Sequence, residues 1–184
     1  MDDAVLVRLS GAAALIGGTL RIADAFISHA FAGPIVQLIY FATDLFLLFG
    51  LAGIYLRRSR SVGMGGFAGL VVTVLGILIV RSSTVLFASA GYAIGAGVTL
   101  VGLAVLSVFI LLRRAGSPLA PLLWLAAVVL GLAGASAAAP YWIASLAGIV
   151  FGAGFVAAGI ELMRAGPEWR LPCPPQRYLR SSMP

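Results

Sequence analysis

The chain has few charged residues and almost none of the residue types that build catalytic or metal sites. Of its 184 residues only 10% are charged, whereas a soluble domain averages about 25%. One cysteine, Cys173, and one histidine, His29, exclude an intrachain disulfide and a Cys/His zinc site. Lysine is absent, so all 12 basic residues are arginine. Without a catalytic, metal or nucleotide-binding motif, we predict no catalytic residues, no metal and no cofactor.

Long apolar runs make up most of the chain. Hydrophobic residues account for 61% of the sequence, and the mean hydropathy is +1.10. Runs of about 20 apolar residues recur, which is the length of a helix that spans a bilayer. One small aqueous core could not bury so much apolar sequence. The composition therefore predicts an all-α integral membrane protein with the lipid bilayer as its first partner.

Turn residues and arginines divide the apolar sequence into six predicted transmembrane helices. The breaks fall at Gly33-Pro34, after Leu56, near Ala88, after Leu112 and at Pro140. The helices would form a six-helix bundle of three hairpins within residues 1–164, followed by a Pro/Arg-rich cytoplasmic tail over 165–184 that its prolines keep from forming one helix. The predicted spans are about 5–29, 35–56, 65–87, 91–112, 119–138 and 141–163, paired as hairpins over about 5–56, 65–112 and 119–163.

The arginines are distributed unevenly between the two sides of this predicted bundle. They follow the second, fourth and sixth spans, while the loops after the odd-numbered spans contain no basic residue. The positive-inside rule then places both termini in the cytoplasm of a bacterial-type inner membrane. These flanks explain the net charge of +6, so we expect no binding to nucleic acid. The arginines concerned are Arg57, Arg58, Arg60, Arg113, Arg114 and Arg164.

Two segments, 91–102 and 148–159, share the pattern GxxxGAGxxxxG. Steps of four and seven residues keep three glycines on one helical face, where small residues let helix backbones approach closely. We therefore predict helix packing at these faces, with a ligand-facing groove as the alternative. The match also predicts that the second and third hairpins are an internal repeat. The glycines are Gly91, Gly95, Gly102, Gly148, Gly152 and Gly159.

Charged residues inside the first three predicted helices form the candidate binding site. Arg21 and Asp24 lie three residues apart in the first, Asp44 lies near the middle of the second, and Arg81 lies in the third. A charge at the centre of a membrane helix costs roughly 2.5–3.5 kcal/mol on insertion scales, so it needs a partner or a function. Two arginines and two aspartates at compatible depths predict a buried polar cluster without net charge. Its other predicted members are His29, Gln37 and Tyr40.

This cluster allows three interpretations of the function. The one we favour is a non-enzymatic protein that binds or transports a small solute or ion, with a cation or proton at Asp44. A clasp between helices would instead indicate a structural or accessory subunit of a larger membrane complex. A membrane-embedded enzyme acting on a lipid-like substrate would need His29 paired with Asp24 or Asp44 as acid and base. We expect this third interpretation least.

The C-terminal tail and the glycine faces indicate further partners. The tail carries aromatic and basic residues that favour binding to anionic lipid headgroups, with a docking segment for a cytoplasmic protein as the alternative. The glycine faces suit a second copy of the chain or another subunit of a membrane complex. Near the end of the last helix, Glu161 is expected to pair locally with Arg164, three residues later. The tail residues are Trp169, Arg170, Arg177, Tyr178 and Arg180.

Overall fold

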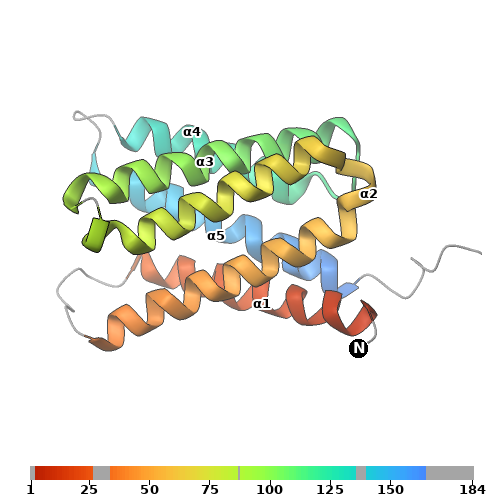
Figure 1. Cartoon of the computed structure of the whole chain (residues 1–184), viewed down its shortest axis with the longest axis horizontal. Coiled ribbons are helices and arrows are strands. Elements are labelled where there is room, and N and C mark those ends of the chain that lie inside the picture. Colours follow the sequence, from red (N-terminus) through yellow and green to blue (C-terminus); the bar gives the residue numbers. More distant parts are fainter. Residues whose placement is uncertain (1–2, 27–33, 87, 136–139, 165–184) are drawn as a thin grey trace, which may run out of the picture.

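The computed structural model describes residues 3–26, 34–86, 88–135 and 140–164 (Figure 1). Every secondary-structure element in these ranges is an α-helix, so the all-helical prediction is confirmed for them. His29, Cys173 and the tail over 165–184 lie outside the described residues. The helices are α1 (Asp3–Asp24), α2 (Pro34–Leu86), α3 (Ala88–Leu112), α4 (Leu119–Gly134) and α5 (Tyr141–Arg164).

The second and third predicted helices are joined in the structure as the 53-residue helix α2. The described residues therefore form five helices, and the predicted count of six is not what the structure has. Within α2, Gly63 has non-helical backbone angles, φ 61° and ψ −155°. A positive φ suits glycine because it lacks a Cβ atom. Figure 1 shows that the chain reverses its direction here, which divides α2 into a first arm, 34–62, and a second arm, 64–86.

Side-chain contacts between the two arms agree with this reversal. Asp44 of the first arm forms an ion pair with Arg81 of the second. The rings of Tyr55 and Phe67 lie 5.7 Å apart between centroids, on the two sides of Gly63. A straight helix rises about 1.5 Å per residue and would separate Asp44 from Arg81 by about 55 Å. The non-helical geometry at one glycine thus brings these two charges together.

Two further helix bounds differ from those predicted. α1 ends at Asp24, where the N–H groups of Ala25 and Phe26 bond to carbonyls three residues back and close its last turn. The predicted helix extends to His29, outside the described residues. α4 ends at Gly134 with 16 residues, and the remainder of its predicted span lies mostly in 136–139, which are also outside the described part.

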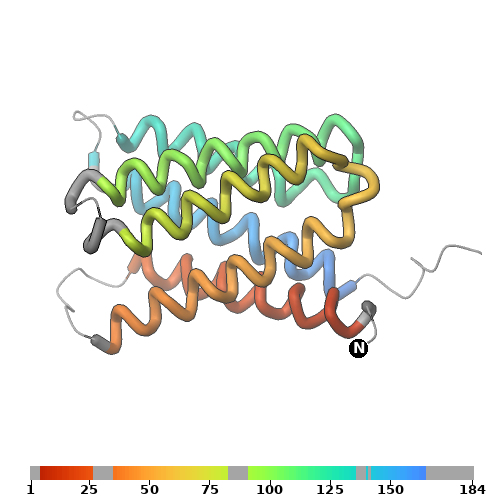
Figure 2. Tube along the Cα trace, viewed as in Figure 1, coloured from red at the N-terminus to blue at the C-terminus, as the bar shows by residue number. Residues whose placement is uncertain are grey.

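The helical segments pack in a closed order around the bundle (Figure 2). α1 packs on α2, the second arm of α2 on α3, α3 on α4, α4 on α5, and α5 packs back on α1. Because α5 and α1 are in close contact, three separate hairpins do not describe the architecture. The start of α1, the reversal at Gly63 and the end of α5 lie at one end of the molecule, to the right in Figure 2. The end of α3 lies there too (Figure 2), and we call this the arginine-rich end because Arg57 precedes Gly63, Arg113 follows α3 and Arg164 ends α5.

One hydrophobic core joins all five helices of the described structure. It includes Ala14 of α1, Leu51 of α2, Leu103 of α3, Trp124 of α4 and Phe155 of α5, each 0% exposed. The rings of Trp124 and Phe155 lie 5.1 Å apart between centroids. Large apolar side chains also cover the outside of the bundle. An outer surface of this kind is unfavourable in water and is the surface that a helix bundle presents to lipid.

Four helical segments of the described structure are long and apolar enough to cross a membrane. They are Val5–Asp24, Ile35–Ser82, Gly91–Leu112 and Trp142–Arg164, judged by length and composition. α4 is apolar but shorter. The fold is thus consistent with the class of helical integral membrane proteins.

Several glycines lie where two helix backbones approach closely. A Cβ atom added at Gly152 of α5 would lie 2.6 Å from the carbonyl oxygen of Gly18 in α1, and one at Gly159 would lie 2.6 Å from that of Gly11. At Gly102 of α3 it would overlap the backbone nitrogen of Thr73. These positions cannot accept a side chain unless the helices separate.

The two segments of the proposed repeat contact different parts of the bundle. Gly95 of α3 faces Val80 in the second arm of α2, the segment that precedes it in the chain. Gly152 faces α1 rather than α4. Gly91 is buried, whereas at its counterpart Gly148 an added Cβ atom would meet no other atom within 4 Å. The internal repeat therefore stays a prediction from the sequence.

Candidate functional site

The first part of the site is the ion pair between Asp44 and Arg81. The Nε of Arg81 donates a hydrogen bond to Oδ2 of Asp44 at 2.8 Å, and Nη2 of Arg81 donates to the same oxygen. The two residues are 37 positions apart and face each other because α2 reverses at Gly63. A guanidinium that donates twice to a carboxylate makes a strong, charge-assisted contact of defined geometry.

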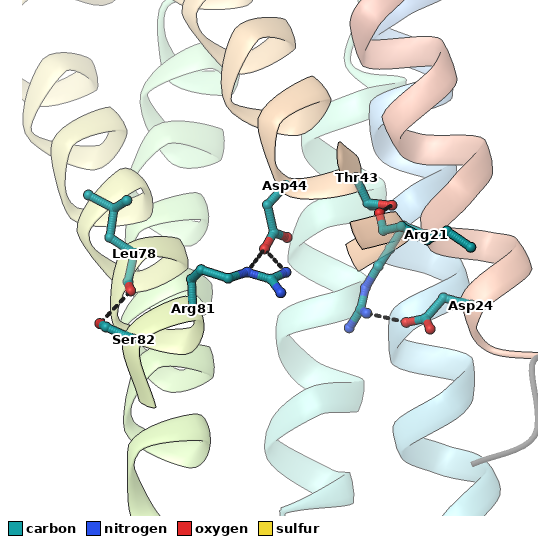
Figure 3. Close-up of polar contacts among 8 residues, drawn as sticks. Arg21, Asp24, Thr43, Asp44, Leu78, Arg81 and Ser82 are labelled. Atoms are coloured by element: carbon teal, nitrogen blue, oxygen red, sulfur yellow. Dashed lines mark hydrogen bonds and ion pairs between the residues drawn. The ribbon is translucent and has the colours of Figure 1, made fainter. Parts of the chain in front are cut away.

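The second part is the ion pair between Arg21 and Asp24 at the end of α1. The Nη1 of Arg21 donates to Oδ2 of Asp24 at 2.5 Å, within one turn of the helix. Tyr40 of the first arm interacts with Asp24, and both Arg21 and Asp24 act electrostatically on Asp44. Figure 3 shows both pairs, with the guanidinium groups directed into the region between α1 and the two arms of α2. We call Arg21, Asp24, Asp44 and Arg81 the Arg/Asp cluster.

All four side chains of the Arg/Asp cluster are partly exposed. The exposed fractions are 34% for Arg21, 18% for Asp24, 23% for Asp44 and 30% for Arg81. The cluster contains two arginines and two aspartates, each arginine paired with one aspartate, so its formal charges cancel. The exposed fractions show that it is also open at its surface. A charge in contact with hydrocarbon is strongly disfavoured, so this open surface needs water, headgroups or a ligand.

The structure brings Tyr40 to the predicted site but leaves Gln37 apart from it. Gln37 is exposed near the start of α2 and forms none of the polar contacts that join the Arg/Asp cluster in the described residues. His29 lies outside the described residues. No group of three or more His, Cys, Asp and Glu residues in the described ranges could hold a metal ion.

A second polar site, which the sequence reasoning missed, lies at the arginine-rich end. The Nη2 of Arg58 donates to Oε2 of Glu161 at 2.6 Å, and the N–H of Ser117 donates to Oε1 at 3.3 Å. Arg57 donates to the carbonyl oxygen of Glu161 at 3.2 Å. Arg58 is only 6% exposed. Glu161 thus pairs with Arg58 rather than with the predicted Arg164, because α5 ends against the reversal of α2.

The sequence contains a signal for this buried arginine. Leu47, Leu51 and Ile54 are all buried, and Arg58 follows them at the same helical spacing. The run of basic residues after Leu56 is typical of a solvated helix flank, and this pattern predicts that Arg58 belongs to that flank. Arg58 instead continues the buried stripe, the helical face that carries Leu47, Leu51 and Ile54. Helical spacing alone distinguishes Arg58 from its exposed neighbour Arg57.

Comparison with protein-family models, with curated proteins and with solved structures finds no match to this chain.

Proposed function

We propose that this chain is a polytopic inner-membrane protein, not an enzyme, that binds and carries a small ion through the Arg/Asp cluster. The observation that supports this most is the partial exposure of four charged side chains on helices with an otherwise apolar surface. Such charges persist in membrane helices where they line a hydrated path or binding site.

We further propose that the chain crosses the membrane six times with both termini in the cytoplasm. α2 has 53 residues and would be about 80 Å long at about 1.5 Å per residue. A bilayer core is about 30 Å thick, so each arm suffices for one crossing. α4, with 16 residues, would be about 24 Å long and is the shortest of the proposed spans. The arginines near Gly63, after α3 and after α5 support a cytoplasmic position for that end.

The geometry of the Asp44–Arg81 pair supports a specific way of handling a cation or proton. Both guanidinium contacts of Arg81 are made to one oxygen, Oδ2 of Asp44. The geometry thus leaves Oδ1 of Asp44 outside the contact with Arg81, and a proton or cation that binds there would neutralise the carboxylate and weaken its attraction for Arg81. Once released, Arg81 would be left without a counter-charge from the first arm, so binding at Asp44 would loosen the contact between the arms.

A flux measurement tests this proposal. The purified protein is reconstituted in liposomes that contain a pH-sensitive dye, and a pH gradient is imposed. We expect liposomes with the wild-type chain to lose the gradient faster than liposomes with the Asp44→Asn/Arg81→Gln variant, which removes both charges together. Arg60→Gln, an exposed arginine outside the cluster, should behave as wild type. Equal rates for the wild type and the double variant would rule out proton transport through Asp44.

The internal pairing of all four charges favours a second candidate, a structural subunit of a membrane complex. In that case the Arg/Asp cluster would act as a clasp between α1 and the two arms of α2. The same liposomes would then show no flux with proton, sodium or potassium gradients. Additional chains would be expected to co-purify with the protein from mild detergent.

A further inference from the structure

A groove of about 430 Å³ lies at the arginine-rich end, away from the Arg/Asp cluster. It is formed where the first arm of α2, the start of α4 and the last turns of α5 meet. Its lining combines basic groups with apolar side chains, and this combination complements the anionic headgroup and acyl chains of a phospholipid. The lining residues are Arg57, Ser117, Leu119, Ala157, Ile160, Glu161 and Arg164.

The groove has an excess of positive charge. Arg57 and Arg164 are exposed at its edge. Its single acid, Glu161, is already held by Arg58 and by the N–H of Ser117. Arg58, the buried partner of Glu161, has two further nitrogens, Nε and Nη1, without a hydrogen-bond partner among the described residues. Among the described residues, one carboxylate therefore faces three arginines, and an anion would balance their remaining charge.

One backbone contact and an apolar wall complete the groove. The partial negative charge at the end of α5 is reduced there, because Arg57 donates to the carbonyl oxygen of Glu161. Leu119, 56% exposed, and Ile160 provide an apolar wall beside these groups.

We propose that this groove binds the phosphate headgroup of an anionic phospholipid, with Arg57 and Arg164 on the phosphate and an acyl chain along Leu119 and Ile160. A lipid fits better than free phosphate because the exposed side chains of Leu119 and, about one turn further along α4, Leu122 offer an acyl chain an apolar surface that free phosphate would not use. This site is independent of the Arg/Asp cluster and does not rest on the proposed transport function.

Thermal unfolding in neutral detergent tests the site. Phosphatidylglycerol, phosphatidylcholine and inorganic phosphate are added separately to the full-length chain. We expect phosphatidylglycerol to raise Tm by several degrees more than the other two. In Arg57→Gln/Arg164→Gln this difference should fall by at least half, whereas the matched control Arg60→Gln/Arg113→Gln, with two exposed arginines at the same end, should keep it.

Other results would overturn the proposal. An equal shift with phosphatidylcholine would show binding without regard to charge, and an equal shift with inorganic phosphate would show a phosphate site rather than a lipid site. An equal loss in the control variant would show general attraction to the basic end. If the groove variant does not fold, native mass spectrometry of the wild type decides: retention of phosphatidylglycerol over phosphatidylcholine supports the site, and equal retention refutes it.

Discussion

The buried Arg58 shows how one charge depends on its partner. It continues the buried stripe of Leu51 and Ile54, and its charge is balanced there by Glu161, 2.6 Å away. A guanidinium does not lose its proton in a protein, so the cost of burying this side chain cannot be reduced by neutralising it. The stability of this end therefore rests on Glu161 more than on the exposed arginines nearby.

We predict that Glu161→Gln destabilises the protein by about 2–3 kcal/mol, less than the about 3–5 kcal/mol of a fully buried pair because Glu161 is partly exposed. Adding Arg58→Met should recover much of the loss, since no unpaired charge then remains buried. Thermal unfolding in detergent measures both changes, with Arg60→Gln as an exposed control. If the double variant is less stable than Glu161→Gln alone, the pair is not the source of the effect.

The Asp44–Arg81 pair leads to a similar prediction at the Arg/Asp cluster. Asp44→Asn should destabilise the protein by about 1–3 kcal/mol, because Arg81 loses both of its contacts to the carboxylate. Combining it with Arg81→Gln should give less than the sum of the two single losses. A double-mutant cycle on unfolding in detergent measures this coupling. Additive losses would show that the two residues stabilise the fold independently.

At the scale of helices, glycine spacing sets how closely the segments approach. α1 and α5 meet through Gly11, Gly18, Gly152 and Gly159, with backbone oxygens at the positions where side chains would begin. In a membrane, lipid is as apolar as leucine, so the hydrophobic effect does not drive helices together. Van der Waals contact between closely packed backbones stabilises their association instead. The contact between α5 and α1, which closes the bundle, thus depends on residues that have no side chain.

Two matched pairs of alanine substitutions test this. Gly152→Ala and Gly95→Ala should each destabilise the protein by about 1–3 kcal/mol, because the new methyl group meets backbone atoms of a neighbouring helix. Gly148→Ala and Gly97→Ala lie on the same two helices, face open space, and should be neutral or slightly stabilising. Unfolding in detergent gives all four values. Similar losses on the same helix, at Gly152 and Gly148 or at Gly95 and Gly97, would show that contact with a neighbouring helix does not determine them, since helix propensity alone favours alanine at all four positions.

For the whole molecule, the distribution of arginines predicts how the bundle lies in the membrane. The reversal at Gly63 and the ends of α3 and α5 share one end of the bundle, which is rich in arginine (Figure 2). The end of α1, which Phe26 follows in the chain, and the start of α5 lie at the opposite end (Figure 2). The positive-inside rule places the arginine-rich end in the cytoplasm.

Cysteine labelling tests this orientation directly, because Cys173 is the chain's single cysteine and can be replaced by serine. In that background we expect Phe26→Cys to react with a membrane-impermeant maleimide in intact cells. Ser61→Cys should react only after the membrane is opened. Both positions are exposed on the protein, so access depends on the side of the membrane. Labelling of Ser61→Cys in intact cells would reverse the proposed orientation.

Local sequence properties are enough to predict the helices and the apolar surface. Apolar length and helical spacing act within a single segment, so they identify helices whatever the segment packs against. The predicted end of a helix at Leu112 agrees with the end of α3 for this reason. The join across Gly63 differs from the prediction, because a glycine with unusual backbone angles can end one helix and begin the next without an intervening loop.

The partners of individual residues depend on contacts between distant segments. The sequence shows that Asp44, Arg81 and Glu161 need counter-charges, since charge in an apolar helix is unfavourable wherever the helix lies. It does not show which arginine each acid meets. Glu161 meets Arg58 rather than Arg164 because α5 ends against the reversal of α2. Gly152 meets α1 rather than α4 because α5 packs on α1 at this glycine. The packing of the complete bundle selects among the possible local pairings.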